Sequence, residues 1–186
     1  MSNQVDYEIN KELGECYLFM GEFDKAKEYY RKAIASEPKN ADPFLGLAAI
    51  ALSIGDMEDA YTLYKKANEL QSSDKSLAGM GMIEVEKQNF EDAFIHYTAA
   101  LDANPVNMVA INGLVQLCHY QARLDEAIPY LEAALAIKND EAIRFALAGS
   151  LLSLGRESES RAHLEVLLGE NPTNSEAQQL YAHFAA

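Results

Sequence analysis

Several kinds of residue and segment are scarce in this sequence, and each scarcity excludes a class of protein. Only two cysteines occur, Cys16 and Cys118, about a hundred positions apart. Such a pair makes no disulfide framework, so we expect two small apolar residues in a reducing compartment, the cytoplasm. No apolar run approaches the roughly 18 residues of a membrane-spanning helix. The opening MSNQVDYEIN also lacks the basic and apolar regions of a secretory signal.

Basic residues are scarce as well. The chain has 15 Lys and Arg against 29 Asp and Glu, which gives a formal net charge of −14. This charge repels phosphate, so we expect neither nucleic acid nor an anionic membrane as a partner. Neutral or basic proteins fit better. The alternative is that the acidity only keeps the chain soluble.

Residues arranged for catalysis or metal binding are missing too. The four histidines, His96, His119, His163 and His183, have no His or Cys partner at metal-ligand spacing. Cys118 and His119 are neighbours, which places them about 100° apart on a helix, a poor geometry for a nucleophile and its base. No phosphate-binding loop or serine nucleophile motif occurs. We therefore expect no enzyme, no catalytic residue, no metal and no cofactor.

What the sequence does contain is a repeat. Five turn residues recur at spacings of 33 or 34 positions: Gly21, Gly55, Gln88, Ala122 and Gly155. A small residue follows each of them by five positions: Ala26, Ala60, Ala93, Ala127 and Ser160. A bulky residue follows the small one by four positions: Tyr30, Tyr64, Tyr97, Leu131 and Leu164. Three positions later comes a second column, which is small in the first four repeats: Ala33, Ala67, Ala100, Ala134 and Leu167. Self-similarity of this length indicates a solenoid of stacked units.

The first repeat carries a recognisable series: Leu13, Gly14, Tyr17, Gly21, Ala26, Tyr30, Ala33 and Pro38. It resembles the tetratricopeptide repeat. The resemblance covers residues 7–174 and implies an all-α, right-handed α-solenoid of five helix-turn-helix repeats. We expect a loose tail at 1–6 and a capping helix at 175–186, with a dimer contact as the alternative role of that helix. Departures from the pattern at Ser72, Asn139, Ser160 and Leu167 predict only local changes in packing.

Helix boundaries follow from the turn and capping residues. The predicted helices are 8–20, 23–36, 43–54, 57–70, 75–87, 90–103, 108–121, 124–137, 141–154, 157–169 and 175–185. Asp42, Asp56, Asn107 and Asp140 are the predicted N-caps. Pro129 lies near enough to the start of its helix to be tolerated.

The resemblance implies that the first helix of each repeat lines a concave groove. Helical offsets place ten candidate peptide-binding residues there: Leu45, Ala49, Leu52, Met82, Val85, Asn112, Gln116, His119, Tyr120 and Phe145. Beyond the first repeat this face is poor in charge, which is typical of a binding surface. Gly46, Gly79, Gly113 and Gly149 are expected to lower its floor, and Asn112 and Gln116 to bond a peptide backbone. The alternative is that these residues pack against neighbouring repeats.

The first repeat differs, because Glu8, Glu12 and Glu15 make this face acidic. The basic residues of the face, Lys11 and Lys75, are surrounded by Glu12, Glu15 and Asp42. The surface is therefore unlike the carboxylate clamp of tetratricopeptide co-chaperones, and an apolar or amphipathic ligand with a basic residue fits better. We predict a non-catalytic adaptor for a protein or peptide. The alternatives are a scaffold that self-associates through its terminal helix or convex face, and an inert spacer. One more repeating column, the outer column, lies on the second helices: Tyr29, Leu63, His96, Tyr130 and His163. It is either a seam between these outer helices or a docking surface.

Overall fold

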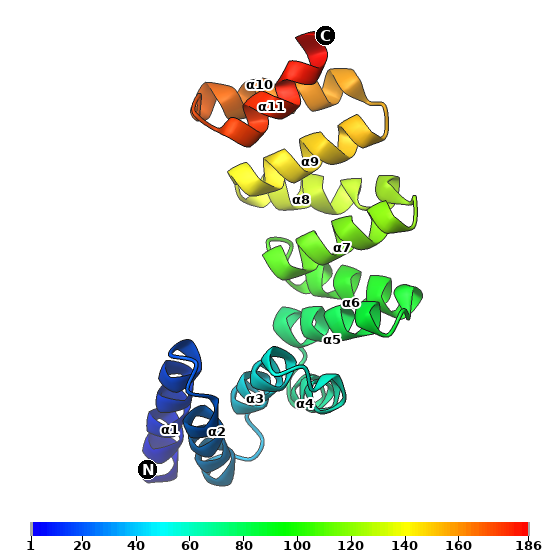
Figure 1. Cartoon of the computed structure of the whole chain (residues 1–186). Coiled ribbons are helices and arrows are strands. Elements are labelled where there is room, and N and C mark those ends of the chain that lie inside the picture. Colours follow the sequence, from blue (N-terminus) through cyan, green and yellow to red (C-terminus); the bar gives the residue numbers. More distant parts are fainter. Residues whose placement is uncertain (1, 186) are drawn as a thin grey trace. The chain divides into compact units, whose positions relative to one another are not determined.

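The computed structural model describes residues 2–185, and all of their regular structure is helical (Figure 1). Five helical hairpins follow one another within this range and a last helix ends it. The elements are α1 (Ser2–Phe19), α2 (Phe23–Ser36), α3 (Asp42–Ser53), α4 (Met57–Leu70), α5 (Asp74–Glu86), α6 (Phe90–Ala103), α7 (Met108–Tyr120), η1 (Leu124–Glu126), α8 (Ile128–Ile137), α9 (Glu141–Ser153), α10 (Glu157–Glu170), α11 (Ser175–Ala182) and η2 (His183–Ala185). The chain forms two compact units, Met1–Ala100 and Leu101–Ala186, with the boundary inside α6.

Each hairpin turns at the residue that the sequence predicts. All five turn residues have positive φ: Gly21, Gly55 and Gly155, and also Gln88 (62°) and Ala122 (55°). In the first turn the amide of Glu22 donates to the carbonyl of Tyr17 and that of Gly21 to Leu18. The same pair of bonds closes the other four turns. This is the Schellman ending of a helix, which requires a left-handed residue after the last turn.

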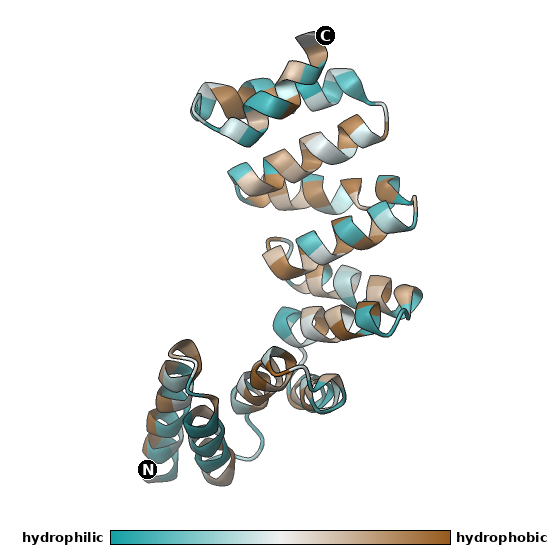
Figure 2. Ribbon diagram, in the orientation of Figure 1, coloured by the Kyte–Doolittle hydropathy of each residue, from teal (hydrophilic) through white to brown (hydrophobic). Residues whose placement is uncertain are grey.

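The repeating columns form the contacts between helices. Every residue of the two small columns and of the bulky column is buried. Small side chains let helices approach closely, and the bulky column fills the space beside them. Figure 2 shows the result as apolar and polar segments that alternate along each helix. Ser160 is the polar exception. Its hydroxyl donates to the carbonyl of Ala148 at 2.7 Å, so this polar group is hydrogen-bonded inside the core.

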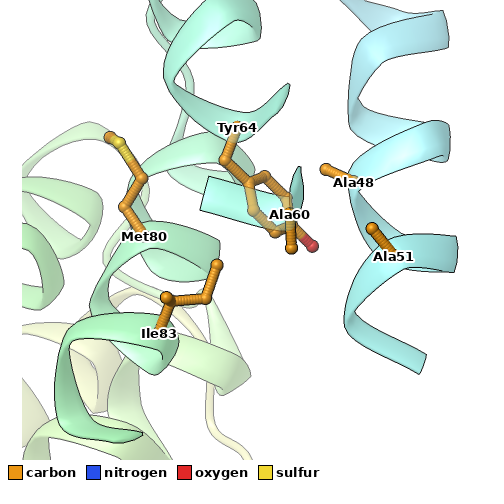
Figure 3. Close-up of a cluster of buried hydrophobic side chains, with 6 residues drawn as sticks. All are labelled: Ala48, Ala51, Ala60, Tyr64, Met80 and Ile83. Carbon is orange, nitrogen blue, oxygen red and sulfur yellow. The ribbon is translucent and has the colours of Figure 1, made fainter. Parts of the chain in front are cut away.

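In the first unit, tyrosine rings are the largest core elements. Figure 3 shows Tyr64 between Ala48 and Ala51 of α3 on one side and Met80 and Ile83 of α5 on the other. A side chain at Gly79 would collide with the ring of Tyr64, and one at Gly46 with the ring of Tyr30. These two glycines therefore leave the space that the two core rings occupy. The prediction that they lower the floor of a groove is wrong.

Several predicted boundaries shift by one residue, and the helix predicted at 175–185 ends at Ala182 and continues as η2. Three further predictions need correction. Helix α1 begins at Ser2, so residues 2–6 are helical where a loose tail was expected; residue 1 lies outside the described range, as does residue 186 at the other end. Asp42 is the first residue of α3, and Ala41 holds the cap position without a side-chain bond. Asp56, Asn107 and Asp140 do cap their helices.

The third correction concerns the helix predicted at 124–137. It divides into η1 and α8, with Pro129 in the first turn of α8. Proline lacks an amide hydrogen, so it is tolerated in the first turn of a helix, where that amide would have no partner within the helix, and not further in. The α-helix therefore starts at Ile128, and the preceding turn takes the 3₁₀ form.

Candidate functional site

The candidate residues of the first unit lie on α3 and α5 and remain accessible. Leu45, Ala49, Leu52 and Val85 are half-buried, and Met82 is 37% exposed. Leu45 and Leu52 also pack against the edge of the core cluster around Tyr64. We call these five residues the first-helix surface of the first unit. It is apolar and shallow, and part of it already contributes to packing.

The candidates of the second unit are on α7 and α9. Asn112, Gln116, His119 and Tyr120 are exposed on α7, at spacings that place them along one side of the helix. Phe145 of α9 is half-buried at the edge of a core cluster. These five form the first-helix surface of the second unit. It combines hydrogen-bonding side chains with two aromatic rings.

A hollow of about 330 Å³ opens between elements of the second unit. Its lining is mostly apolar and comes from α7, η1, α9 and α11: Val115, His119, Leu124, Phe145, Ala146, Gly149, Ser150, Leu152, Ser153 and Leu180. The structure thus brings His119 and Phe145 together at one site. Asn112, Gln116 and Tyr120 do not line the hollow, although they share α7 with His119. A volume near 300 Å³ lies at the small end of the range for ligand pockets.

The last helix supplies one wall of this hollow. Leu180, Tyr181 and Phe184 pack against a cluster of Ala148, Leu164, Leu167 and Ala177. The hydroxyl of Tyr181 lies 2.9 Å from Glu165 Oε1, and the Arg161 guanidinium lies 5.6 Å from the centre of the tyrosine ring. Figure 1 shows α11 against α10. The helix therefore covers the final hairpin, and its apolar side chains are engaged within the chain.

Sequence reasoning missed part of this lining. Val115 follows Asn112 by three positions and could have been included by helical spacing. Leu124 could not, because it lies beyond the left-handed turn at Ala122. Leu180 belongs to a helix whose docking position is a tertiary fact.

Another hollow, of about 520 Å³, lies at the turn ends of the first two hairpins. Gly21, Glu22, Phe23, Asp24, Lys25, Lys27 and Ile54 line it. Lys25 pairs with Glu22 at 2.5 Å and lies over the ring of Tyr17 at 5.0 Å. This second hollow contains none of the predicted site residues.

The outer column is partly covered by first helices, with Tyr29 against α1 and His163 3.4 Å from Arg144 of α9, and the choice between a seam and a docking surface stays a prediction. All five of its members are half-buried, and Tyr29 stacks on Tyr17 with ring centres 5.3 Å apart. Burial lowers the pKa of His96, against the opposing effect of Glu84 and Asp92. Burial and then Arg144 lower the pKa of His163. Both histidines therefore favour the neutral form in the folded chain.

Residues 2–185 hold no group of three His, Cys, Asp or Glu side chains placed to bind a metal ion. Over the same range, none of the helices combines the length and apolar character required to cross a bilayer.

Comparison with protein families gives a match along most of the chain. One profile of the tetratricopeptide repeat matches residues 17–80 and 119–184, and a second matches 79–142. Among curated proteins, the BBSome complex member BBS4 of Bos taurus is 32% identical over 59% of this chain and 21% of its own length. Tetratricopeptide repeat protein 21A of Mus musculus is 26% identical over 74% of this chain and 10% of its own length. The chain thus spans about a fifth or less of these relatives.

Solved structures show the same fold. A structure described as Pseudomonas aeruginosa pilF has a TM-score of 0.78 at 21% identity, with 97% of this chain and 83% of that chain covered. MamA has a TM-score of 0.68 at 21% identity, covering 92% and 94%. YrrB, described as having an unusual peptide-binding site, has a TM-score of 0.65 at 14% identity, covering 91% and 89%.

Proposed function

Because this chain belongs to the tetratricopeptide repeat family, we propose that it is a non-catalytic adaptor for a segment of a partner protein. The segment is apolar or amphipathic and binds on the first-helix surfaces. The single observation that carries the proposal is the apolar hollow in the second unit, where Phe145 and His119 meet Leu180. A large apolar side chain of the partner enters it.

The polar side chains beside the hollow suit an extended peptide. Asn112 and Gln116 are exposed on α7, and neither side chain has a hydrogen bond to another residue of the range 2–185. Amide side chains both donate and accept, so they can pair with a peptide backbone while the hollow takes one of its side chains. Tyr120 is 74% exposed and adds an apolar face near the end of α7.

Charge and size limit the ligand further. A net charge of −14 attracts basic segments and repels acidic ones. One side chain in a small hollow gives modest affinity, on the order of 1–100 μM, or about −8 to −5.5 kcal/mol. The first-helix surface of the first unit supplies a second apolar contact area for the same class of segment.

Filling the hollow tests the proposal. A Cβ atom at Gly149 would meet only Leu180, at 4.0 Å, and Gly149 lines the hollow, so Gly149→Leu adds apolar volume to its lining. Random peptides displayed on phage are selected on the wild-type chain, and their affinities are measured by fluorescence polarisation. We expect peptides with Leu, Ile or Phe near Lys or Arg. Gly149→Leu should weaken them about tenfold or more, the loss for one apolar side chain left unburied.

The matched control is Gly169→Leu, because Gly169 of α10 has open space around it and lies outside the hollow. It should bind the peptides like the wild type. Gln116→Ala should lower the affinity for the peptides severalfold, because it removes about one hydrogen bond to the peptide backbone. Undiminished binding by Gly149→Leu contradicts the hollow as the site. In the first unit, Met82→Glu tests whether the shallow surface takes part.

The alternative of a self-associating scaffold loses support at the terminal helix. The side chains that would form such a contact, Leu180, Tyr181 and Phe184, pack on the chain's own core. Light scattering across a concentration series distinguishes the two functions, since an adaptor of this kind stays at one mass until a peptide is added.

A further inference from the structure

Helix α1 has an apolar face that nothing in the described residues covers. The position five residues before each turn residue is exposed in the first repeat and buried in all the others: Cys16, then Ile50, Ile83, Leu117 and Ser150. The position twelve residues before each turn residue shows the same difference in exposure. Ile9 is 52% exposed, whereas the equivalent residues are buried: Pro43, Ser76, Ala110 and Ile143. Val5 and Met20, each 57% exposed, extend the same stripe. We call Val5, Ile9, Cys16 and Met20 the α1 end face.

The structure shows what covers the equivalent positions elsewhere in the first unit. Ile50 of α3 clusters with Ala26 and Tyr30 of α2. Ile83 of α5 clusters with Ala60 and Tyr64 of α4. In both cases the cover is the second helix of the preceding hairpin, with a small and a bulky residue four apart. The α1 end face corresponds to these faces of α3 and α5, but no second helix within the described residues packs on it. A helix of that kind can therefore dock there.

Charge at the edges of the face selects among such helices. Helical spacing places Glu12 on one side of the stripe, with Glu8 beyond it, and Asp6 on the other. Glu8 is paired with Lys11 at 3.2 Å, whereas Glu12 and Asp6 have no ion pair within residues 2–185. An apolar stripe between carboxylates favours a helix with basic flanks. It disfavours two copies of α1 packed face to face, because like charges would oppose each other.

We propose that the α1 end face docks a basic amphipathic helix of a partner protein, one with the small–bulky–small spacing of the chain's own second helices. This site is separate from the first-helix surfaces and does not depend on the proposed function. It would let the chain hold a helical element on α1 and an extended segment on the first-helix surfaces.

Two sequences within the chain provide matched probes. The α2 sequence, Phe23–Ser36, has four basic and two acidic residues and carries the spacing Ala26, Tyr30, Ala33. The α6 sequence, Phe90–Ala103, has the same spacing at Ala93, Tyr97 and Ala100 but three acidic residues and no Lys or Arg. Each is made as a capped and stapled peptide, because isolated helices of this length are marginal in water.

Cys16 reports occupancy of the face directly. Its thiol is exposed, whereas Cys118 is buried and its pKa is raised to about 11 by that burial. Alkylation by N-ethylmaleimide, followed by mass spectrometry of the full chain, therefore reads Cys16. We expect the α2 peptide to slow this alkylation severalfold, with the effect weakening as salt is added. The α6 peptide should protect much less.

Substitutions locate the site. Ile9→Glu should weaken the α2 peptide about tenfold or more, since it removes one buried apolar contact and adds a like charge at the acidic edge. The chain should still fold, because Ile9 is half exposed. Ile95→Glu is the control: Ile95 is 59% exposed on α6 in the same unit, at a position exposed in every repeat. It should leave binding unchanged. Gly149→Leu should also leave it unchanged, which separates this site from the hollow.

Three results would overturn the proposal. Equal protection of Cys16 by both peptides would show apolar adsorption without charge selection. An absence of protection would show that the face does not accept such a helix. Protection that rises with the concentration of the chain alone, together with a dimer in sedimentation velocity, would show that a second copy covers the face.

Discussion

The two units use glycine on their first helices in opposite ways. In the first unit, Gly46 and Gly79 lie directly against the rings of Tyr30 and Tyr64, with no room for a Cβ atom. In the second unit, Gly149 faces the hollow, and only Leu180 comes within 4.0 Å of a Cβ built there. The same residue type therefore completes a core in one unit and lines an open hollow in the other.

The two kinds of glycine stand at different repeat positions, since Gly46 and Gly79 lie nine residues before their turn residue and Gly149 lies six before its own. At the position nine before, the bulky column decides whether glycine is needed. It carries Tyr30 and Tyr64 in the first unit and Leu131 and Leu164 in the second. A tyrosine ring reaches as far as the backbone of the next first helix, so that helix needs glycine at the contact. Leucine is shorter, and Ala146 occupies the position that corresponds to Gly79. A glycine on a first helix indicates a binding site only where no ring already occupies it.

The largest expected effect tests this pairing. Gly79→Ala should lower the free energy of unfolding by about 1–3 kcal/mol, because the methyl group overlaps the Tyr64 ring inside a packed core. This loss exceeds the roughly 1 kcal/mol that alanine gains over glycine in a helix. Gly149→Ala should instead raise stability by up to about 1 kcal/mol. Urea denaturation followed by circular dichroism measures both changes.

A double-mutant cycle sharpens the test. Tyr64→Leu recreates the Leu131–Ala146 pairing when it is combined with Gly79→Ala, so the double variant should be more stable than the sum of the single changes predicts. Additive losses would show that the glycine and the ring are energetically independent.

A smaller effect is expected at the turns. Ala122 has φ of 55°, a conformation that costs a residue with a Cβ about 1 kcal/mol. Ala122→Gly should therefore raise the free energy of unfolding by about this amount, and Gly155→Ala, at the equivalent turn of the next hairpin, should lower it by a similar amount. If both substitutions lowered stability, the left-handed geometry would not be the governing cost.

The smallest effect concerns pH. The folded-state pKa of His96 is lowered by burial, although Glu84 and Asp92 oppose the shift. The unfolded chain therefore binds more protons as pH falls through about 6.5, and the stability that neutral His96 contributes is complete above that pH and lost below it. His96→Gln should reduce the loss of stability on acidification. The exposed His183→Gln is the control, and urea midpoints on either side of about pH 6.5 measure both. An unchanged slope in His96→Gln would contradict the shift.

Much of the fold could be predicted because each signal is local. The turn positions are set by residues that tolerate a left-handed backbone, and even Gln88 and Ala122 were located by their register with the glycines. Three helices have the predicted bounds, 23–36, 57–70 and 90–103. The divided helix at Pro129 and the helical start at Ser2 were missed. The first depends on how one proline shifts a helix start. The second is a helix that extends past its first buried residue, Tyr7, through residues 3–6, which are exposed.

The candidate site was only partly predictable. Helical spacing correctly placed His119 and Phe145 on first helices, where the structure joins them at one hollow. It could not show that Leu124 and Leu180 complete the lining, since both reach it from other elements. Register separates Gly149, six residues before its turn residue, from Gly79, nine before, but it could not show that a ring fills one position and not the other, because those contacts come from other helices.

The sequence by itself determined the repeat, its helical hairpins, the residues of its core and its acidic character, because periodic size and charge act through neighbours one helical turn or one hairpin away. Only the tertiary structure decided which glycines are filled by rings, where a hollow remains and which face of α1 lies uncovered. Those outcomes depend on whether two side chains from separate helices reach the same space, and no spacing along the chain records that distance.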